Sequence, residues 1–293
     1  MDQQIQCPAE CYLCGGNTHR QRSGVVRDAS GLKIMECNHC GLVFLSSFEH
    51  IQGSHYELSG MHGDELPDVT EWLIESETDD QRRLNFIKPK LIRKELLDFG
   101  CGAGGFLSKA RHFAANVAGL EPELRLQDYF NESGIKVYAT LGEVFATGSR
   151  FDVITAFHVV EHLPDPRSIL SQLSGLLNSG GELIIEVPNS DDALLTLFEC
   201  EPFTKFTYWS QHLFLFNQRT LSDLIQQAGL KMLWVKQVQR YSLSNHLYWL
   251  SRGKPGGHKK WSFIDSQVLN ESYSSQLAAL GKCDTVIAGV SPD

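Results

Sequence analysis

The sequence predicts an α/β protein, with a mostly parallel sheet covered by helices on both faces and preceded by a small cysteine-rich module. From residue 93 onward, short apolar runs alternate with helical patterns, the order that builds a parallel sheet from strand–helix–strand units. Before residue 45, five of the eight cysteines gather in one stretch. We therefore expect a four-cysteine zinc-binding module over residues 1–45, a helical connector over 46–92 and an α/β domain over 93–293.

Composition and charge narrow the class of protein. The chain has 293 residues, of which 42% are apolar and 21% are charged, ordinary values for a globular protein. Its net charge of -9 argues against a general nucleic-acid binder, which needs a basic surface. No run approaches the ~18 apolar residues of a membrane span, and the first residues lack a signal-peptide pattern. We expect a cytoplasmic protein with reduced cysteines and no membrane partner.

Two Cys-x-x-Cys pairs form the most specific local motif. The segments "CYLC" and "CNHC" place Cys11, Cys14, Cys37 and Cys40 with 22 residues between the pairs. Each pair offers two thiolates from one tight turn, and two such turns complete a tetrahedron around Zn²⁺. Four thiolates leave no open coordination position, so the motif predicts a structural zinc ion. The alternatives are four unmetallated core thiols, or a set in which Cys7 replaces Cys11.

The elements of the α/β region can be assigned one by one. Strands are expected at residues 95–100, 116–122, 135–139, 151–157, 181–188, 231–238 and 283–290. Helices are expected at residues 68–91, 104–114, 123–134, 165–180 and 217–230. Helix ends are expected at Gly134, Gly180 and Gly229, because glycine favours the left-handed conformation found there. Two long insertions, residues 189–216 and about 239–280, should lie at the carboxyl edge of the sheet, where ligands bind.

A glycine-rich turn follows the first strand of this region. The run "ELLDFGCGAGGFL" places Gly100, Gly102 and Gly104 directly after an apolar strand, and bare backbone there lets a ligand approach closely. The same letters also fit a dinucleotide fingerprint, with its third glycine one residue later. Asp98 favours a different ligand, because a carboxylate repels a pyrophosphate at close range but attracts an ammonium or sulfonium group.

Further polar residues stand where neighbouring strands end. Glu121 closes the second strand about 20 residues on, where a carboxylate can accept both hydroxyls of a ribose. After the fourth strand, the segment "FDVITAFHVVEHLPDP" brings His158, Glu161 and His162 within five residues. The sequence therefore predicts a polar site at the carboxyl edge.

These segments carry a resemblance to a known family. In their order and spacing, "LLDFGCGAGGFL", "GLEP", "FDVITAFHVVEHLPDP" and "GGELIIEVPN" resemble a class I S-adenosylmethionine (SAM)-dependent methyltransferase of the small-molecule branch that includes ubiquinone-pathway O-methyltransferases. The paired cysteines are similar to those of sugar C-methyltransferases, although the long C-terminal domain of those enzymes is not seen. The resemblance implies a Rossmann-like seven-stranded class I methyltransferase sheet with one antiparallel strand, and SAM as the methyl donor.

The resemblance also implies which residues bind SAM. Asp98 would bind the methionine amino group, and Glu121 would bind the ribose hydroxyls. Further donor contacts are expected from Gly100, Cys101, Gly102, Gly104, Leu141, Phe157 and His158.

The acceptor is expected at the same face. The two insertions are rich in aromatic and polar residues, which suits a small polar acceptor, such as the hydroxyl of a sugar, a nucleotide-sugar or another biosynthetic intermediate. A hydroxyl acceptor needs a base, and the candidates are, in order, His158, His212, Glu161 and His162; the last two can instead orient the following helix. Acceptor contacts are expected from Tyr56, Arg240, Tyr241, Asn245 and His246. Arg240 suits an anionic group, and the basic stretch 252–260 is either a lid or a solvated loop.

Four other interpretations remain open. The chain can be a zinc-ribbon adaptor whose α/β domain is only a scaffold, or an RNA methyltransferase that uses the ribbon as a clamp. A nicotinamide dehydrogenase and a domain that has lost its ligand are the other two.

Overall fold

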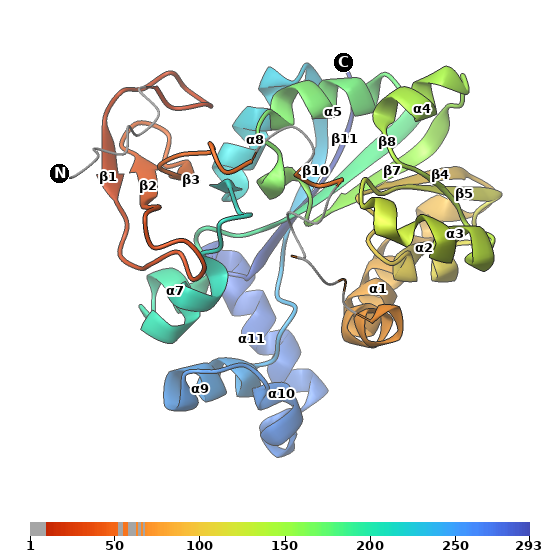
Figure 1. Cartoon of the computed structure of the whole chain (residues 1–293). Helices are drawn as coiled ribbons and strands as arrows, with labels where there is room; N and C mark the ends of the chain where they lie inside the picture. The colour runs from red at the N-terminus through yellow and green to blue at the C-terminus, as the bar shows by residue number, and fades with distance from the viewer. Residues whose placement is uncertain (1–9, 52–54, 58–62, 64–65, 67) are drawn as a thin grey trace.

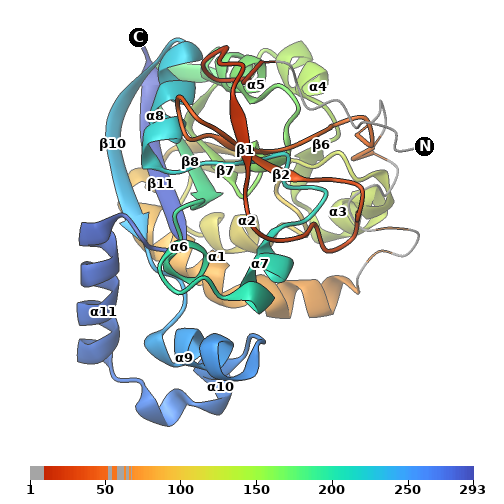
Figure 2. The same cartoon turned by 90° about the vertical axis from the view of Figure 1, so that its left-hand side faces the viewer.

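The computed structural model describes most of the chain (Figure 1). The described residues are 10–51, 55–57, 63, 66 and 68–293. They form a large sheet flanked by helices, a small sheet at one side, and a helical extension (Figures 1 and 2).

The large sheet has seven strands in the order β10-β11-β8-β7-β4-β5-β6. Their bounds are β4 Glu95–Phe99, β5 Asn116–Leu120, β6 Lys136–Tyr138, β7 Phe151–Phe157, β8 Leu177–Pro188, β10 Leu230–Val238 and β11 Thr285–Pro292. Strand β11 runs antiparallel to both of its neighbours, which confirms the expected topology. After β4 the chain continues to β5 on one side, whereas β7 lies on the other side. This reversal opens a crevice at the carboxyl ends of the strands, where such sheets bind ligands.

Two groups of helices cover the two faces of this sheet (Figure 1). Helices α1 (Val69–Leu91), α2 (Gly105–Ala110) and α3 (Gln127–Ser133) pack on one face, and α4 (Leu141–Ala146), α5 (Pro166–Ser174) and α8 (Gln218–Gln227) pack on the other. Their starts follow from capping side chains, since Asp68, Asp165 and Asn217 accept hydrogen bonds from free backbone N–H groups in the first turn.

Two helix ends differ from the prediction. Helix α2 was expected to reach residue 114, but it ends at Ala110. Helix α5 was expected to reach Gly180, but it ends at Ser174 with Gly175 as its C-cap. The reason is tertiary packing. Leu176 is fully buried, and Leu177 already pairs with Phe151 at the start of β8, so the sheet takes residues that local propensity assigns to the helix.

The cysteine-rich module forms a second, four-stranded sheet. Its strands are β1 His19–Gln21, β2 Ile34–Cys37, β3 Val43–Leu45 and, from the first insertion, β9 Phe214–Leu215. Tyr12 also contacts the start of α5, where its hydroxyl donates to Asp165 at 2.5 Å and accepts from the Arg167 N–H at 2.9 Å. The module is therefore joined to the large domain by a shared sheet and a shared apolar core.

The insertions supply the remaining helices. The first contains α6 (Ala193–Thr196) and α7 (Glu201–Thr207), and the second contains α9 (Leu243–Arg252), α10 (Gly257–Lys260) and α11 (Gln267–Leu280). Helices α9, α10 and α11 form an extension at the lower end of the molecule in both views (Figures 1 and 2). Within the described ranges, no helix is both long and apolar enough to cross a membrane.

Candidate active site

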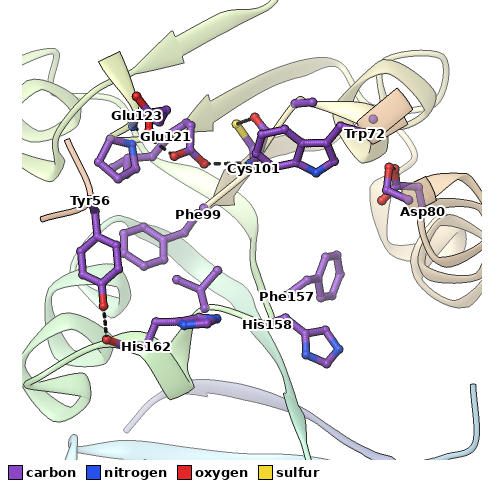
Figure 3. Close-up of a pocket in the computed structure, with 18 of the residues that line it drawn as sticks. Tyr56, Trp72, Asp80, Phe99, Cys101, Glu121, Glu123, Phe157, His158 and His162 are labelled. Atoms are coloured by element: carbon purple, nitrogen blue, oxygen red, sulfur yellow. Dashed lines mark hydrogen bonds between the residues drawn. The ribbon is translucent and has the colours of Figure 1, made fainter. Parts of the chain in front are cut away.

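The carboxyl edge of the large sheet opens into a cavity of about 480 Å³ (Figure 3), within the usual range for small-molecule sites. One end is lined by the glycine turn and Glu121, and the other by His158, His162 and Arg240. The predicted residues Tyr56, Cys101 and Phe157 also line it.

The glycine turn requires glycine for two reasons: its backbone conformation, and the lack of space for a Cβ beside neighbouring side chains. Gly100, Gly102 and Gly104 have φ angles of 73°, 51° and 75°, in the left-handed region that disfavours other residues. A Cβ on Gly100 would lie 2.4 Å from a methyl group of Val159, and one on Gly102 would lie 3.0 Å from the Trp72 ring. The turn is thus shaped by backbone rather than by side chains.

Two acids accompany this turn, Asp98, which is buried, and Glu121, which is half-buried and lines the cavity. Glu121 accepts hydrogen bonds from the Gly102 N–H at 2.9 Å and the Glu123 N–H at 3.1 Å. Asp98 is buried behind the cavity wall and accepts the Thr155 hydroxyl at 2.6 Å. Burial raises the pKa of each carboxyl to about 7. A cationic ligand would favour their ionised forms.

Helix α1 contributes a wall that the sequence analysis missed. Trp72, Ser76, Asp80 and Arg83 line the cavity from this helix, and Figure 3 shows Trp72 and Asp80 on the side opposite Tyr56. The sequence does contain a signal for this wall, because the strand "GELIIEVP" carries a charged residue, Glu186, within an apolar run. A buried charge needs a partner, and "DDQRR" in α1 offers two arginines.

Glu186 joins helix α1 to the sheet. Its side chain is 0% exposed and accepts a bidentate pair from Arg82 at 2.9 Å and a further pair from Arg83 at 3.0 and 2.9 Å. Although burial opposes ionisation, His158 and Arg83 hold the pKa of Glu186 well below its ordinary value. The carboxylate is therefore charged and is shared by both arginines, which also pair with Asp79 and Asp80 of the same helix.

His158 is fixed by the same group of charges. Its φ is 57°, and its backbone N–H donates to the Glu186 carbonyl at 2.8 Å. Its Nδ1 lies 3.2 Å from Glu161 Oε1, and its Nε2 lies 3.3 Å from Glu186 Oε1 and 3.2 Å from Arg240 Nη1. Although burial disfavours the imidazolium, the two carboxylates raise the pKa of His158. His158 is therefore suited to holding a proton rather than to accepting one.

Three other predicted base candidates form a cluster beside it. His162 Nδ1–H donates to the Gln211 carbonyl at 2.8 Å, and His212 Nδ1–H donates to the Thr207 carbonyl at 3.0 Å, so Nε2 of each ring is left as an acceptor. Burial lowers the pKa of His162 and lowers that of His212 to about 4, and both rings are neutral at neutral pH. Glu161 Oε2 is buried and has no hydrogen-bond partner among the described residues. One ligand atom from each of Glu161, His162 and His212 lies within 4.8 Å of the others, close enough to share a metal ion.

Arg240 and Tyr56 bound the cavity in different ways. Arg240 donates from Nε to Asp79 of helix α1 at 3.0 Å and also contacts this carboxylate through Nη2. Burial opposes ionisation of the Asp79 carboxyl, but the charge of Arg240 lowers the pKa of Asp79 to about 2. Arg240 thus already has an anionic partner within the chain. The Tyr56 hydroxyl donates to the His162 carbonyl at 2.5 Å (Figure 3).

The other predicted site residues lie away from this cavity. Leu141 begins α4 and packs against the core. Asn245 Oδ1 accepts the N–H groups of Gly256 and Gly257, each at 3.1 Å, and thereby shapes the extension. His246 is buried against the Tyr273 hydroxyl at 2.8 Å. Tyr241 is 40% exposed.

The four cysteines of the module meet as the spacing predicts. The sulfurs of Cys11 and Cys40 are 3.6 Å apart, those of Cys14 and Cys37 are 3.5 Å apart, and all four lie within 4.8 Å of one another. Zinc–sulfur bonds of about 2.3 Å in a tetrahedron place sulfurs roughly 3.8 Å apart. The donor set fits Zn²⁺ in chemistry and geometry. The alternative ligand Cys7 lies outside the described residues.

The sheet order, with the glycine turn at its switch point, is the Rossmann-like arrangement of the class I SAM-dependent methyltransferases. The chain belongs to the methyltransferase domain family, whose sequence model matches residues 76–235.

Two curated proteins and one solved structure are similar to parts of this chain. The chain is 30% identical over 176 residues to a tRNA U34 carboxymethyltransferase of Campylobacter hominis, covering 56% of this chain and 60% of the relative. It is 37% identical over 123 residues to a ubiquinone biosynthesis O-methyltransferase of Actinobacillus pleuropneumoniae, covering 36% and 52%. The matches thus span less than two thirds of either relative. A solved SAM-dependent methyltransferase from Archaeoglobus fulgidus aligns with a TM-score of 0.45 and 18% identity, over 75% of this chain and 98% of that one.

Proposed function

We propose that this methyltransferase moves the methyl group of SAM to a hydroxyl of a small polar molecule. The observation that carries the proposal is one cavity with two unlike ends. Glycine backbone and carboxyls suit a cationic donor, and a neutral imidazole suits a hydroxyl that must lose a proton. The named ubiquinone biosynthesis relative, an O-methyltransferase, supports oxygen as the accepting atom. A sugar or nucleotide-sugar hydroxyl is our first acceptor class.

The donor-end residues divide the work of binding SAM, which supplies a methyl group activated by a positive sulfur. Glu121 would accept the ribose hydroxyls, and Asp98 would balance the cationic methionine end from behind the turn. Gly100 and Gly102 would leave room for close contact, and Trp72 would cover the donor from helix α1. The cavity lining and the raised pKa of both carboxyls support these roles.

We assign the base to His162 in place of His158. His162 lines the cavity, and its Nε2 is an acceptor because Nδ1–H is donated to Gln211. Removing one positioned base costs typically 10²- to 10⁴-fold in rate. Methyl transfer also requires an aligned acceptor and exclusion of water, to which Tyr56 contributes at the cavity edge.

The test is to screen hydroxyl-bearing acceptors, sugar nucleotides and phenols first, for release of S-adenosylhomocysteine. With the best acceptor, His162→Asn should lower kcat by about a hundredfold or more and leave the SAM dissociation constant unchanged. His112→Asn, an exposed control, should match the wild type. Unchanged turnover in His162→Asn would remove the base assignment, and turnover of amine acceptors alone would remove oxygen as the accepting atom.

The four-cysteine module would hold one structural zinc ion. The four thiol sulfurs support this role, and a closed set of four thiolates leaves no position for a substrate. We retain the division into a four-cysteine zinc-binding module over 1–45, a connector over 46–92 and the enzyme domain over 93–293. Metal analysis of the purified chain should find one zinc per chain, and none after Cys11→Ser with Cys40→Ser.

A second candidate acceptor is RNA. A relative named as a tRNA U34 carboxymethyltransferase supports it, whereas the net charge of -9 opposes it. Retention of labelled tRNA on a filter, reduced by added salt, would favour RNA over a small molecule.

A further inference from the structure

The helical extension carries a basic, apolar surface that the active site does not use. Residues 241–270 contain four cations, Arg252, Lys254, Lys259 and Lys260, and a single acid, Asp265, so their formal charge is +3 in a chain of net charge -9. Within the described residues, no ion pair involves any of the four cations. Asp265 is turned toward helix α9, where it accepts the Ser244 hydroxyl at 2.6 Å.

Large exposed apolar side chains follow these cations closely in the sequence. Phe263, between α10 and α11, is 82% exposed, and Val268, in the first turn of α11, is 74% exposed. Two neighbouring aromatic residues are packed instead of exposed, since Trp261 lies edge-on against Tyr248 with ring centroids 5.0 Å apart. The extension thus has a packed interior, to which Phe263 does not contribute. We call the four cations with Phe263 and Val268 the basic tip.

The position of the basic tip suits contact with a flat surface. Helices α9 and α10 and the start of α11 lie at the end of the molecule far from the large sheet (Figures 1 and 2). The second insertion begins at the cavity, since Arg240 lines it. Docking at the tip would therefore leave the active-site cavity uncovered. The second insertion would connect the docked helices to that cavity.

We propose that the basic tip docks the enzyme on an anionic lipid surface. Lysines and arginines attract acidic headgroups, while an exposed phenylalanine and valine enter the boundary between headgroups and acyl chains. A nucleic acid would match the cations but would give the aliphatic Val268 nothing to bury against, so charge and apolarity together favour lipid. The expectation of no membrane partner rested on spanning segments, and that criterion does not test binding at a surface.

The test is flotation of the full chain with vesicles. It should float with vesicles of phosphatidylcholine and phosphatidylglycerol in equal parts, stay behind with phosphatidylcholine alone, and detach as salt rises. Phe263→Ser should weaken binding about tenfold or more. Lys259→Gln with Lys260→Gln should weaken it roughly 25-fold, since each cation near the surface contributes roughly fivefold. Ile74→Ser, which alters a side chain on α1 that is 70% exposed, should bind like the wild type.

Several outcomes would overturn the proposal. Wild-type chain that binds SAM but ignores anionic vesicles would do so, as would equal binding to both vesicle types or full binding by Phe263→Ser. Retention of a polynucleotide without any vesicle binding would assign the tip to nucleic acid instead. Because SAM titration is run on the same sample, failure here is distinguishable from failure of the proposed reaction.

Discussion

The two ends of the active-site cavity are built in opposite ways. The end that we propose for the donor comes mainly from two short segments, the turn after β4 and the end of β5, and its shape depends on glycine backbone. The acceptor end gathers Tyr56, His158, His162 and Arg240 from distant parts of the chain. There the shape depends on ion pairs that run from helix α1 to Glu186 and from Arg240 to Asp79.

Because of this difference, the two ends differ in how readily substitution can change what they bind. A backbone cradle leaves little scope for side-chain variation, so it suits a donor common to many enzymes. An end assembled from charged side chains can be altered by substitution in any of several segments. Variants at each end can show whether the two ends depend on these different forces.

The largest expected effect is on stability. Glu186→Gln should lower the free energy of unfolding by about 3 kcal/mol, because Arg82 and Arg83 lose the buried carboxylate that they share and keep only Asp79 and Asp80 as anionic partners. Denaturant unfolding measures this. Glu77→Gln on the same helix is the control, since Glu77 is 57% exposed in its pair with Lys109, and it should cost less than about 1 kcal/mol. Equal losses in the two variants would contradict the role given to Glu186.

The next effect distinguishes a steric clash in the glycine turn from the strain of a left-handed backbone conformation. Gly100→Ala should weaken SAM binding about a hundredfold or more, a loss of about 2.7 kcal/mol, because the new methyl group collides with Val159 in the cavity wall. Gly148→Ala is the matched control, with a φ of 68° and nothing within 4 Å of its built Cβ. It should cost about 1 kcal/mol of stability and leave SAM binding intact. Calorimetric titration decides, and unaltered SAM affinity in Gly100→Ala would contradict a backbone-shaped donor end.

Arg240 tests whether the two ends are coupled. Because Arg240 pairs with Asp79 on the helix that covers the donor, Arg240→Ala should weaken SAM binding about tenfold and also raise the KM of the acceptor. Binding and steady-state measurements give the two values separately. A raised KM with unchanged SAM affinity would show that Arg240 acts on the acceptor alone.

The last expected effect concerns pH. Asp98 and Glu121 have pKa values raised to about 7 by burial, and a cationic donor binds better to their ionised forms. The free protein then holds more protons than the complex, so SAM affinity should fall as pH drops through 7, by up to about tenfold per carboxyl between pH 8 and pH 6. Flat affinity across this range would show that neither carboxyl ionises on binding.

Much of the fold followed from local patterns. All seven strands, helix α1 and the four-cysteine cluster lie where periodicity and spacing placed them. Two things did not follow. Trp72 and Asp80 lie against the glycine turn only because α1 folds over it, and no local pattern predicts that contact. The ranking of His158 as first base also did not anticipate its environment, since the neighbouring carboxylate of Glu186 is 28 residues away in sequence.

The most direct test of the account is a calorimetric titration of SAM into the full-length chain and into Glu121→Ala. The account predicts saturable binding at one site in the wild type. In Glu121→Ala, binding should be at least about tenfold weaker, because a hydrogen-bonding carboxylate is lost, while circular dichroism stays unchanged. A folded wild-type chain with no saturable heat, or a variant that binds SAM as well as the wild type, would contradict the donor site described here.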